Sequence, residues 1–235
     1  MIRRRALIVG APDDTIPGVD IDLTNWQNFL QSPLGGAWER QEITILRNPN
    51  KILLDWHIHQ INEGSNYTLF AFSGHGELVT STDTHIHIND QQKMDATAFR
   101  SKAKKQTIIL DCCRFPAERE RFYEALAKNM SMEQHQDRQA CRQLYDRHIE
   151  TCDDGLVRLY SCSVNETAGD SEAFGGYYTN GLISSASATF RLQTIKQAHE
   201  AAKQKVARLR DDQHPVGEFP RSHNSFPFAV STSLF

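Results

Sequence analysis

The stretch FAFSGHGE at residues 70–77 sets one histidine between two glycines, directly after a run of aromatic and β-forming residues. A second stretch, TIILDCCRFP at residues 107–116, ends a similar apolar run on an aspartate and two cysteines. Short apolar runs of this kind are typical of buried strands. We expect the two strands to be neighbours in one sheet, with His75 and the cysteines just past their ends.

The order of elements along the chain predicts the fold class. Residues 6–9 and 43–46 form two further apolar runs, and stretches with helical spacing lie between the four runs. These helical stretches are centred on residues 23–30, 52–61 and 96–103. Strands that alternate with helices predict an α/β fold with a mostly parallel central sheet and helices on both faces. Binding sites of such folds lie at the carboxyl ends of the strands.

The remaining segments extend this pattern. Residues 79–88 alternate polar and β-branched side chains and predict a surface hairpin. Residues 116–154 are rich in Glu, Gln, Arg and Ala, and predict a helical insertion within a single domain that covers residues 1–235. A strand at 156–162, a helix at 195–209 and a last strand in FPFAV complete the expected elements.

Composition excludes several classes of protein. The chain has 235 residues, of which 39% are hydrophobic and 23% charged, and its net charge is -3. This composition is typical of a globular protein with a real core, and it favours neither nucleic acid nor an acidic membrane surface as a partner. No run approaches the roughly 18 apolar residues of a membrane span. We therefore expect a cytoplasmic protein whose five cysteines are free thiols.

The histidine and the cysteines suggest a thiol protease. A histidine and a cysteine beyond the ends of adjacent strands fit a dyad in which the imidazole takes the thiol proton and the thiolate attacks a peptide carbonyl. The glycines beside His75 let a substrate backbone approach, and the N–H of Gly76 could donate to the developing oxyanion. The alternative is that Cys112 and Cys113 are buried core thiols at the end of a strand.

An ordered set of motifs carries a family resemblance. It consists of ALIVG, GVDIDLTNWQNFL, FSGHGE, IILDCCR, LYSCSVNETA and GGYYTNGL. In this order the motifs resemble those of caspase-like cysteine proteases, and among them the metacaspases, paracaspases and bacterial orthocaspases. The resemblance implies a caspase-like three-layer fold and a cysteine endopeptidase that needs no cofactor. It covers most of the chain except the helical segment at 116–154.

The resemblance also assigns the nucleophile. The family places its cysteine directly before the Arg or His of the motif and two residues after an acid or Gln, which maps onto Cys113. Cys112 then occupies a filler position, and it points to the opposite side if the strand continues.

A binding pocket for a substrate side chain follows from the same resemblance. In metacaspases and paracaspases, an acid at the Asp111 position and another at the start of the first helix line a pocket for Arg or Lys. The second acid maps onto Asp22, with Asp20 as a rival two residues earlier, although Asp22 could instead serve as a helix N-cap. Ser73 resembles a further pocket member. Glu166 is a candidate third acid or else a solvated loop carboxylate.

The pocket of true caspases, which cut after Asp, is absent from the sequence. Those proteases carry Gln where this chain has Asp111, and an Arg near the first helix where this chain has Ile16. The resemblance therefore implies cleavage of protein or peptide substrates after Arg or Lys. Lys128, Arg138, Arg142 and Arg147 are candidate sites of self-cleavage in the helical segment.

Other functions remain as alternatives. His57 with His59 and His85 with His87 are metal-ligand candidates without a third ligand, and no acidic cluster for calcium stands out, so we expect no metal. A catalytically inactive caspase-like interaction module is the main rival, and a different hydrolase chemistry on the same sheet is another. Because the sequence shows no sensor domain, we expect control by a partner protein, a bound ligand or processing. The resemblance further implies a role in bacterial stress or antiphage cell death.

Overall fold

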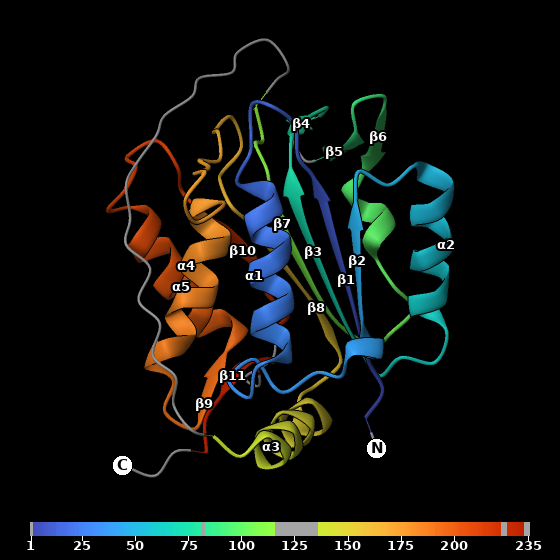
Figure 1. The fold of residues 1–235 in the computed structure, drawn as a ribbon, viewed down its shortest axis with the longest axis vertical. Helices are drawn as coiled ribbons and strands as arrows, with labels where there is room; N and C mark the ends of the chain where they lie inside the picture. Colours follow the sequence, from blue (N-terminus) through green and yellow to red (C-terminus); the bar gives the residue numbers. More distant parts are fainter. Residues whose placement is uncertain (1, 81–82, 116–135, 222–224, 233–235) are drawn as a thin grey trace.

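A central sheet organises the computed structural model, which describes residues 2–80, 83–115, 136–221 and 225–232 (Figure 1). Within these residues the sheet has six strands in the order β10-β8-β7-β3-β1-β2. Their bounds are β1 Arg4–Ala11, β2 Ile43–Arg47, β3 Tyr67–Gly74, β7 Lys105–Asp111, β8 Gly155–Tyr160 and β10 Val216–Glu218. Five strands are parallel, and only β10 runs antiparallel to its neighbour. The strands predicted from apolar runs are confirmed.

Helices cover both faces of the sheet. Helices α1 (Val19–Gln31), α4 (Tyr177–Ser185) and α5 (Ile195–Val206) lie on one face, and α2 (Lys51–Asn62) lies on the other (Figure 1). Alternate residues of β1 enter the two cores, since Ala6 and Ile8 pack on the α1 side while Leu7 and Val9 pack on the α2 side. A strand buried on both faces must be apolar throughout, which explains the unbroken runs in the sequence. The predicted three-layer α/β fold is confirmed.

The prediction of a helix at residues 96–103 is wrong. Only one short turn of 3-10 helix, Ala96–Phe99, forms there. The ring of Phe99 stacks on the ring of Phe70 in β3. Beyond it, the side chain of Gln106 accepts from the Ser101 N–H and donates to the Ser101 carbonyl. Because these bonds satisfy the backbone locally, the segment needs no helix to bury it.

Two small antiparallel sheets flank the main one. Strands β4 (Gly76–Leu78), β5 (Thr84–Asn89) and β6 (Gln92–Asp95) form the first, so the predicted hairpin exists and continues into a third strand. Strands β9 (Leu192–Thr194) and β11 (Pro227–Val230) form the second. The last strand therefore forms as predicted, but it pairs with β9 outside the main sheet.

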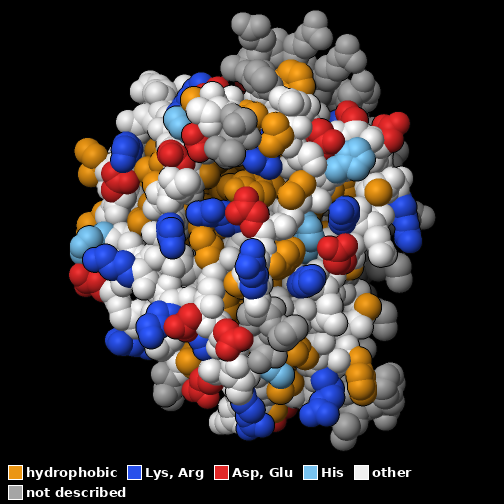
Figure 2. All heavy atoms as spheres, turned by 180° about the vertical axis from the view of Figure 1, so that it is seen from behind, with side chains coloured by type: hydrophobic (Ala, Val, Ile, Leu, Met, Phe, Trp, Pro, Cys, Tyr) orange, Lys and Arg blue, Asp and Glu red, His pale blue; other side chains and the backbone are white. Residues whose placement is uncertain are grey.

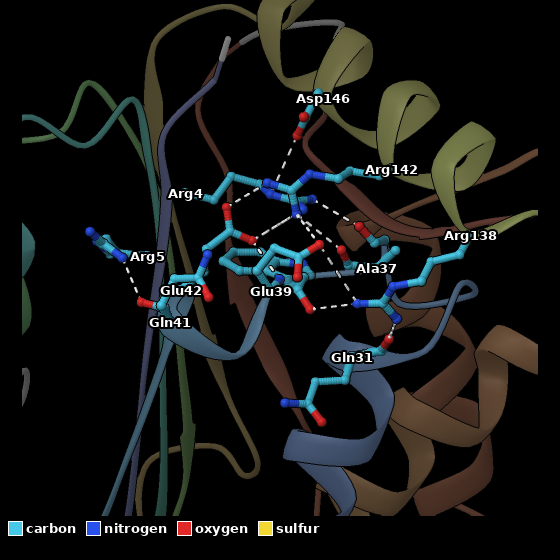
Figure 3. A network of polar contacts seen from close by, with 12 residues as sticks. Arg4, Arg5, Gln31, Ala37, Glu39, Gln41, Glu42, Arg138, Arg142 and Asp146 are labelled. Carbon is cyan, nitrogen blue, oxygen red and sulfur yellow. Dashed lines mark hydrogen bonds and ion pairs between the residues drawn. The ribbon is translucent and has the colours of Figure 1, made fainter.

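Helix α3 (Arg138–Thr151) closes the end of the sheet at which the strands begin (Figure 1). A buried ionic network attaches it there (Figure 3). Arg142 of α3 donates to both oxygens of Glu42 at 2.7 and 2.8 Å, and Arg4 of β1 forms an ion pair of 3.3 Å with Asp146. The guanidinium of Arg4 also lies 4.6 Å from the ring centre of Trp38. Charged and aromatic groups thus fix α3 to the base of the fold.

This attachment bears on the candidate self-cleavage sites. Arg138, Arg142 and Arg147 all lie within α3, whose backbone would have to unwind before a protease could bind it as an extended strand. Lys128 lies outside the described residues. The helical insertion at 116–154 and the single domain stay predictions, although α3 shows that the second part of this segment contains a helix.

The reverse side of the molecule carries mixed charge. Figure 2 shows Lys and Arg side chains spread over this face, many of them beside acidic side chains. Among the described residues, no helix combines the length and the apolar character that crossing a membrane requires.

Candidate active site

A cavity of about 400 Å³ opens at the carboxyl ends of β1, β3 and β7. Four parts of the chain line it: the segment between β1 and α1, the residues that end β3 and β7, the loop that precedes α4, and Arg210 in the segment after α5. Principal lining residues are Asp14, Thr15, Ile16, Ser73, His75, Asp111, Cys113, Ala168, Gly169, Asp170 and Arg210. Most residues that the motifs single out therefore face one cavity.

His75 and Cys113 both line this cavity. His75 directly follows the end of β3 at Gly74, and Cys113 lies two residues beyond the end of β7, the adjacent parallel strand. The backbone N–H of Ala168 donates to the Cys113 sulfur at 3.4 Å. The predicted pair of strand ends thus places an imidazole and a thiol in the lining of one cavity, and these are the two groups that a cysteine nucleophile with a histidine base requires.

The two adjacent cysteines occupy different environments. Ile108 and Leu110 of β7 belong to the core on the α2 side, and Cys112 continues this alternation with 1% of its surface exposed. Burial raises the pKa of the Cys112 thiol well above its ordinary value. Cys113 falls on the opposite side, with Asp111, and lines the cavity. Of these two adjacent cysteines, only Cys113 reaches the cavity.

Gly76 belongs to β4 and packs closely behind the cysteines. A Cβ atom at this position would lie 2.6 Å from the Cys112 sulfur and 2.7 Å from the Cys113 carbonyl oxygen. The glycine is therefore required by the close approach of the two backbones. Its contribution to an oxyanion site stays a prediction.

Two buried acids lie at this end of the sheet: Asp111 lines the cavity, whereas Asp22 does not line it and contacts the lining residue Ser73. Asp22 of α1 is fully buried, and Asp111 at the end of β7 is 4% exposed. Burial, and next the charge of Asp111, raises the pKa of Asp22 well above its ordinary value. Burial likewise raises the pKa of Asp111 to about 6. Ser73 of β3 donates a short hydrogen bond of 2.5 Å to Asp22, so all three residues meet.

The amino end of α4 holds these acids in place. The N–H of Gly176 donates to both oxygens of Asp22 at 3.0 and 3.1 Å, and the N–H of Thr179 donates to Asp111 at 2.8 Å. A helix amino terminus stabilises negative charge, which offsets part of the cost of burial. A Cβ atom at Gly176 would lie 2.4 Å from the Asp111 carboxylate, so glycine is needed for this approach.

Another acid that lines the cavity is Asp170, which the sequence analysis missed. One of its oxygens accepts from the N–H of Gly18 at 2.9 Å, and the other, which is buried, has no hydrogen-bond partner in the described part of the chain. Burial raises the pKa of Asp170 above its ordinary value. No pattern in the sequence distinguishes this aspartate from its acidic neighbours, because its place depends on the fold of the loop before α4.

The structure corrects the expectation that Glu166 is a pocket acid. Its carboxylate accepts from the backbone N–H groups of Ser163 and His214, and it contacts the His214 ring at 2.6 Å. It does not line the cavity. The reason is local, because these bonds fold the carboxylate back onto its own turn and onto the chain before β10.

The structure also distinguishes Asp20 from Asp22, the two rival positions for the acid of the first helix. Asp20 is exposed and forms an ion pair of 2.7 Å with Arg47 at the surface. Asp22 lies within the first turn of α1, whose N-cap is Gly18, so Asp22 is not the cap. Ile16 lines the cavity at the position where an Arg would align in a caspase.

A buried cation, Arg210, also lines the cavity and was not expected from the sequence. Its side chain is 5% exposed and forms an ion pair of 2.6 Å with Asp212. It also donates to the Thr167 hydroxyl at 3.1 Å, beside the residue whose N–H contacts the Cys113 sulfur. Arg210 thus supports the loop that borders the thiol.

Metal ligands do not gather near these residues. In the part of the chain that the structure describes, no group of three or more His, Cys, Asp or Glu side chains is arranged to hold a metal ion. His85 and His87 share one face of β5, and His87 contacts Glu77 at 3.6 Å.

Comparisons with known proteins agree with this geometry. The family model of the caspase domain matches residues 3–226. The crystal structure of a caspase-1 from Spodoptera frugiperda is similar in fold, with a TM-score of 0.64 and 13% sequence identity over 100% of this chain and 92% of that chain. A search of curated proteins gives no match.

Proposed function

Because the chain belongs to the caspase domain family of peptidases, we propose that it is a cysteine endopeptidase that cleaves proteins after Arg or Lys. The observation that carries this proposal is the cavity lined by Cys113, His75, Asp111 and Asp170, with Asp22 hydrogen-bonded to its lining residue Ser73. The first two groups supply peptidase chemistry, and the three acids supply the specificity.

The reaction follows from the dyad. His75 takes the proton of the Cys113 thiol, and the thiolate attacks the carbonyl carbon of the scissile peptide bond. The N–H of Gly76 donates to the oxyanion of the tetrahedral intermediate. His75 then gives its proton to the leaving amine, and the bond to nitrogen breaks to leave a thioester on Cys113. Water attacks this thioester with His75 again as the base, which releases the acid product and restores the thiol.

The preference for a basic side chain rests on electrostatics. Within the described residues, Asp22, Asp111 and Asp170 form no ion pair with Lys or Arg, and burial raises the pKa of each. A guanidinium or ammonium group that enters beside them relieves this cost, whereas a substrate Asp adds another negative charge. The planar fork of Arg can engage two carboxylates at once, which favours Arg over Lys.

The cellular role is proposed from the motifs of the sequence. Similarity of the motifs to bacterial orthocaspases supports a cytoplasmic enzyme that acts in stress or antiphage cell death. A partner protein or a ligand would then activate it. Assays of phage resistance in cells that express the wild-type protein or the Cys113→Ala variant test this role.

Labelling of the thiol tests the proposed chemistry. A peptide electrophile that ends in Arg should label the wild-type protein and the Cys112→Ala variant, and it should not label Cys113→Ala. Cleavage of an Arg peptide should follow the same pattern. An inactive interaction module would show no cleavage with any of the three proteins, and labelling that depends on Cys112 would refute the assignment of the nucleophile.

A further inference from the structure

The segment between β1 and α1 places a carboxylate against the ring of His75. One oxygen of Asp13, Oδ2, lies 2.8 Å from His75 Nε2, and the hydroxyl oxygen of Thr15 lies 3.0 Å from the same nitrogen. The His75 side chain is 19% exposed and that of Asp13 is 38% exposed. The contact therefore lies at the edge of the cavity, partly shielded from water.

The loop itself holds Asp13 in this position. Its other oxygen, Oδ1, accepts from the Thr15 N–H at 2.8 Å, from the Thr15 hydroxyl at 2.6 Å and from the Ile16 N–H at 3.2 Å. Burial acts to raise the pKa of Asp13, but the hydrogen bonds from Thr15 and the charge of His75 lower it below its ordinary value. Asp13 is therefore ionised at neutral pH, with Oδ2 aimed at the ring.

These contacts determine which ring nitrogen carries the proton. An ionised carboxylate can only accept, and the hydroxyl proton of Thr15 is already donated to Asp13. Both atoms that face Nε2 therefore act as acceptors, so Nε2 bears the proton of the neutral ring. The basic lone pair of His75 is then on Nδ1.

We propose that Asp13 is a positioning residue for His75. It fixes the tautomer in which Nδ1 can take the Cys113 proton, and it stabilises the imidazolium that this transfer forms. The catalytic part of this inference rests on the proposed function, whereas the tautomer does not. The site then contains a cysteine, a histidine and an aspartate acting together.

Several other titratable groups of the described residues lie near the His75 ring. His87 of β5 lies behind His75, with ring centres 6.0 Å apart. Burial, and then the charge of Lys93, lowers the pKa of His87, so its ring is neutral at neutral pH. Lys93 and Glu77, which flank His87, pair with each other at 2.8 Å. Asp170 is a further acid near the ring, and the charge of His75 acts to lower its pKa.

The Asp13→Asn variant separates positioning from loop structure. The asparagine oxygen can keep the three hydrogen bonds that Oδ1 accepts, while its amide group can only donate toward Nε2. The variant should therefore move the ring proton to Nδ1 and remove the base. We expect kcat on an Arg peptide to fall by about 10- to 100-fold with little change in KM. Asp20→Asn, which removes an exposed charge from α1, is the matched control and should leave kcat unchanged.

NMR of the histidine ring nitrogens gives a readout that is independent of activity. The spectra are recorded on the Cys113→Ala protein with the His75 ring in its neutral form, and loss of signals in His75→Gln identifies the ring. The proton is expected on Nε2, and on Nδ1 after Asp13→Asn is added. An unprotonated Nε2 in Cys113→Ala, or a kcat of Asp13→Asn within twofold of wild type, would overturn the inference. If the wild-type enzyme cleaves no peptide, the proposed function fails, and the tautomer measurement still decides the role of Asp13.

Discussion

The two ends of the central sheet both bury acidic side chains, but they treat them in opposite ways. At the end where the strands begin, Glu42 and Asp146 face arginines from β1 and α3 (Figure 3). At the end where the strands finish, Asp22 and Asp111 face backbone N–H groups of α4. One cluster is neutralised within the protein, and the other is not.

The pKa values record this difference. Burial acts to raise the pKa of Glu42, but hydrogen bonds from Arg142 and the charge of Arg4 bring it below its ordinary value. Burial still raises the pKa of Asp146, although the charges of Arg4 and Arg142 act to lower it. The pKa of both Asp22 and Asp111 is raised. A compensated acid cluster stabilises the fold, whereas an uncompensated one at the mouth of a cavity is suited to bind a cation.

The largest effect on stability is expected at the compensated end. Arg4→Met leaves Asp146 without its ion-pair partner and should lower the free energy of unfolding by about 3 to 5 kcal/mol. Arg5→Met removes an exposed guanidinium that only donates to the Gln41 carbonyl, and should cost far less. Urea denaturation measures both. Equal losses in the two variants would show that the network does not hold the base of the fold.

At the end where the strands finish, removal of one charged group should reduce activity and leave the stability intact. Asp111→Asn can keep the hydrogen bond from Thr179, but it removes a charge from the pocket. We expect kcat/KM for an Arg peptide to fall by about 2 to 5 kcal/mol in transition-state free energy, with the stability unchanged or raised. Steady-state kinetics and urea denaturation test this pair of expectations. A variant that is less stable and fully active would reverse our interpretation of the two clusters.

Asp170 and Glu166 offer a comparison within one loop. Asp170→Asn should lower kcat/KM for an Arg peptide by about 1 to 3 kcal/mol, because its unpartnered oxygen faces the cavity region. Glu166→Gln should change it little, since that carboxylate is turned toward His214. Kinetics with one Arg peptide are sufficient. A larger loss of kcat/KM in Glu166→Gln than in Asp170→Asn would show that Glu166 is a pocket acid after all.

The smallest effect concerns pH. Since the pKa of Asp111 is about 6 in the folded protein and near 3.8 when unfolded, the folded state binds the extra proton between these values. Acidification from about pH 7 to 5 should therefore add about 1 kcal/mol to the stability through this group. Urea denaturation of wild type and Asp111→Asn at both pH values isolates the contribution. An identical response of the two proteins would mean that Asp111 is not perturbed by burial.

Much of the fold could be predicted because buried parallel strands are apolar throughout. The alternation that separates Cys112 from Cys113 is a local property of a strand and was predictable for the same reason. Asp170 was not, because the side chains that surround it come from segments far apart in the chain. Asp13 left a signal in the turn-forming run PDDT, yet its contact with His75 spans 62 positions and requires the sheet. Local pattern gave the strands, and tertiary contacts decided which acids meet.

The most direct test compares three peptides that differ only in the residue before the scissile bond, which is Arg, Lys or Asp. The wild-type protein should cleave the Arg peptide fastest, the Lys peptide more slowly and the Asp peptide not measurably, and Cys113→Ala should cleave none of them. Efficient cleavage after Asp, or cleavage that persists in Cys113→Ala, would contradict the account of an acid-lined pocket that serves a cysteine nucleophile.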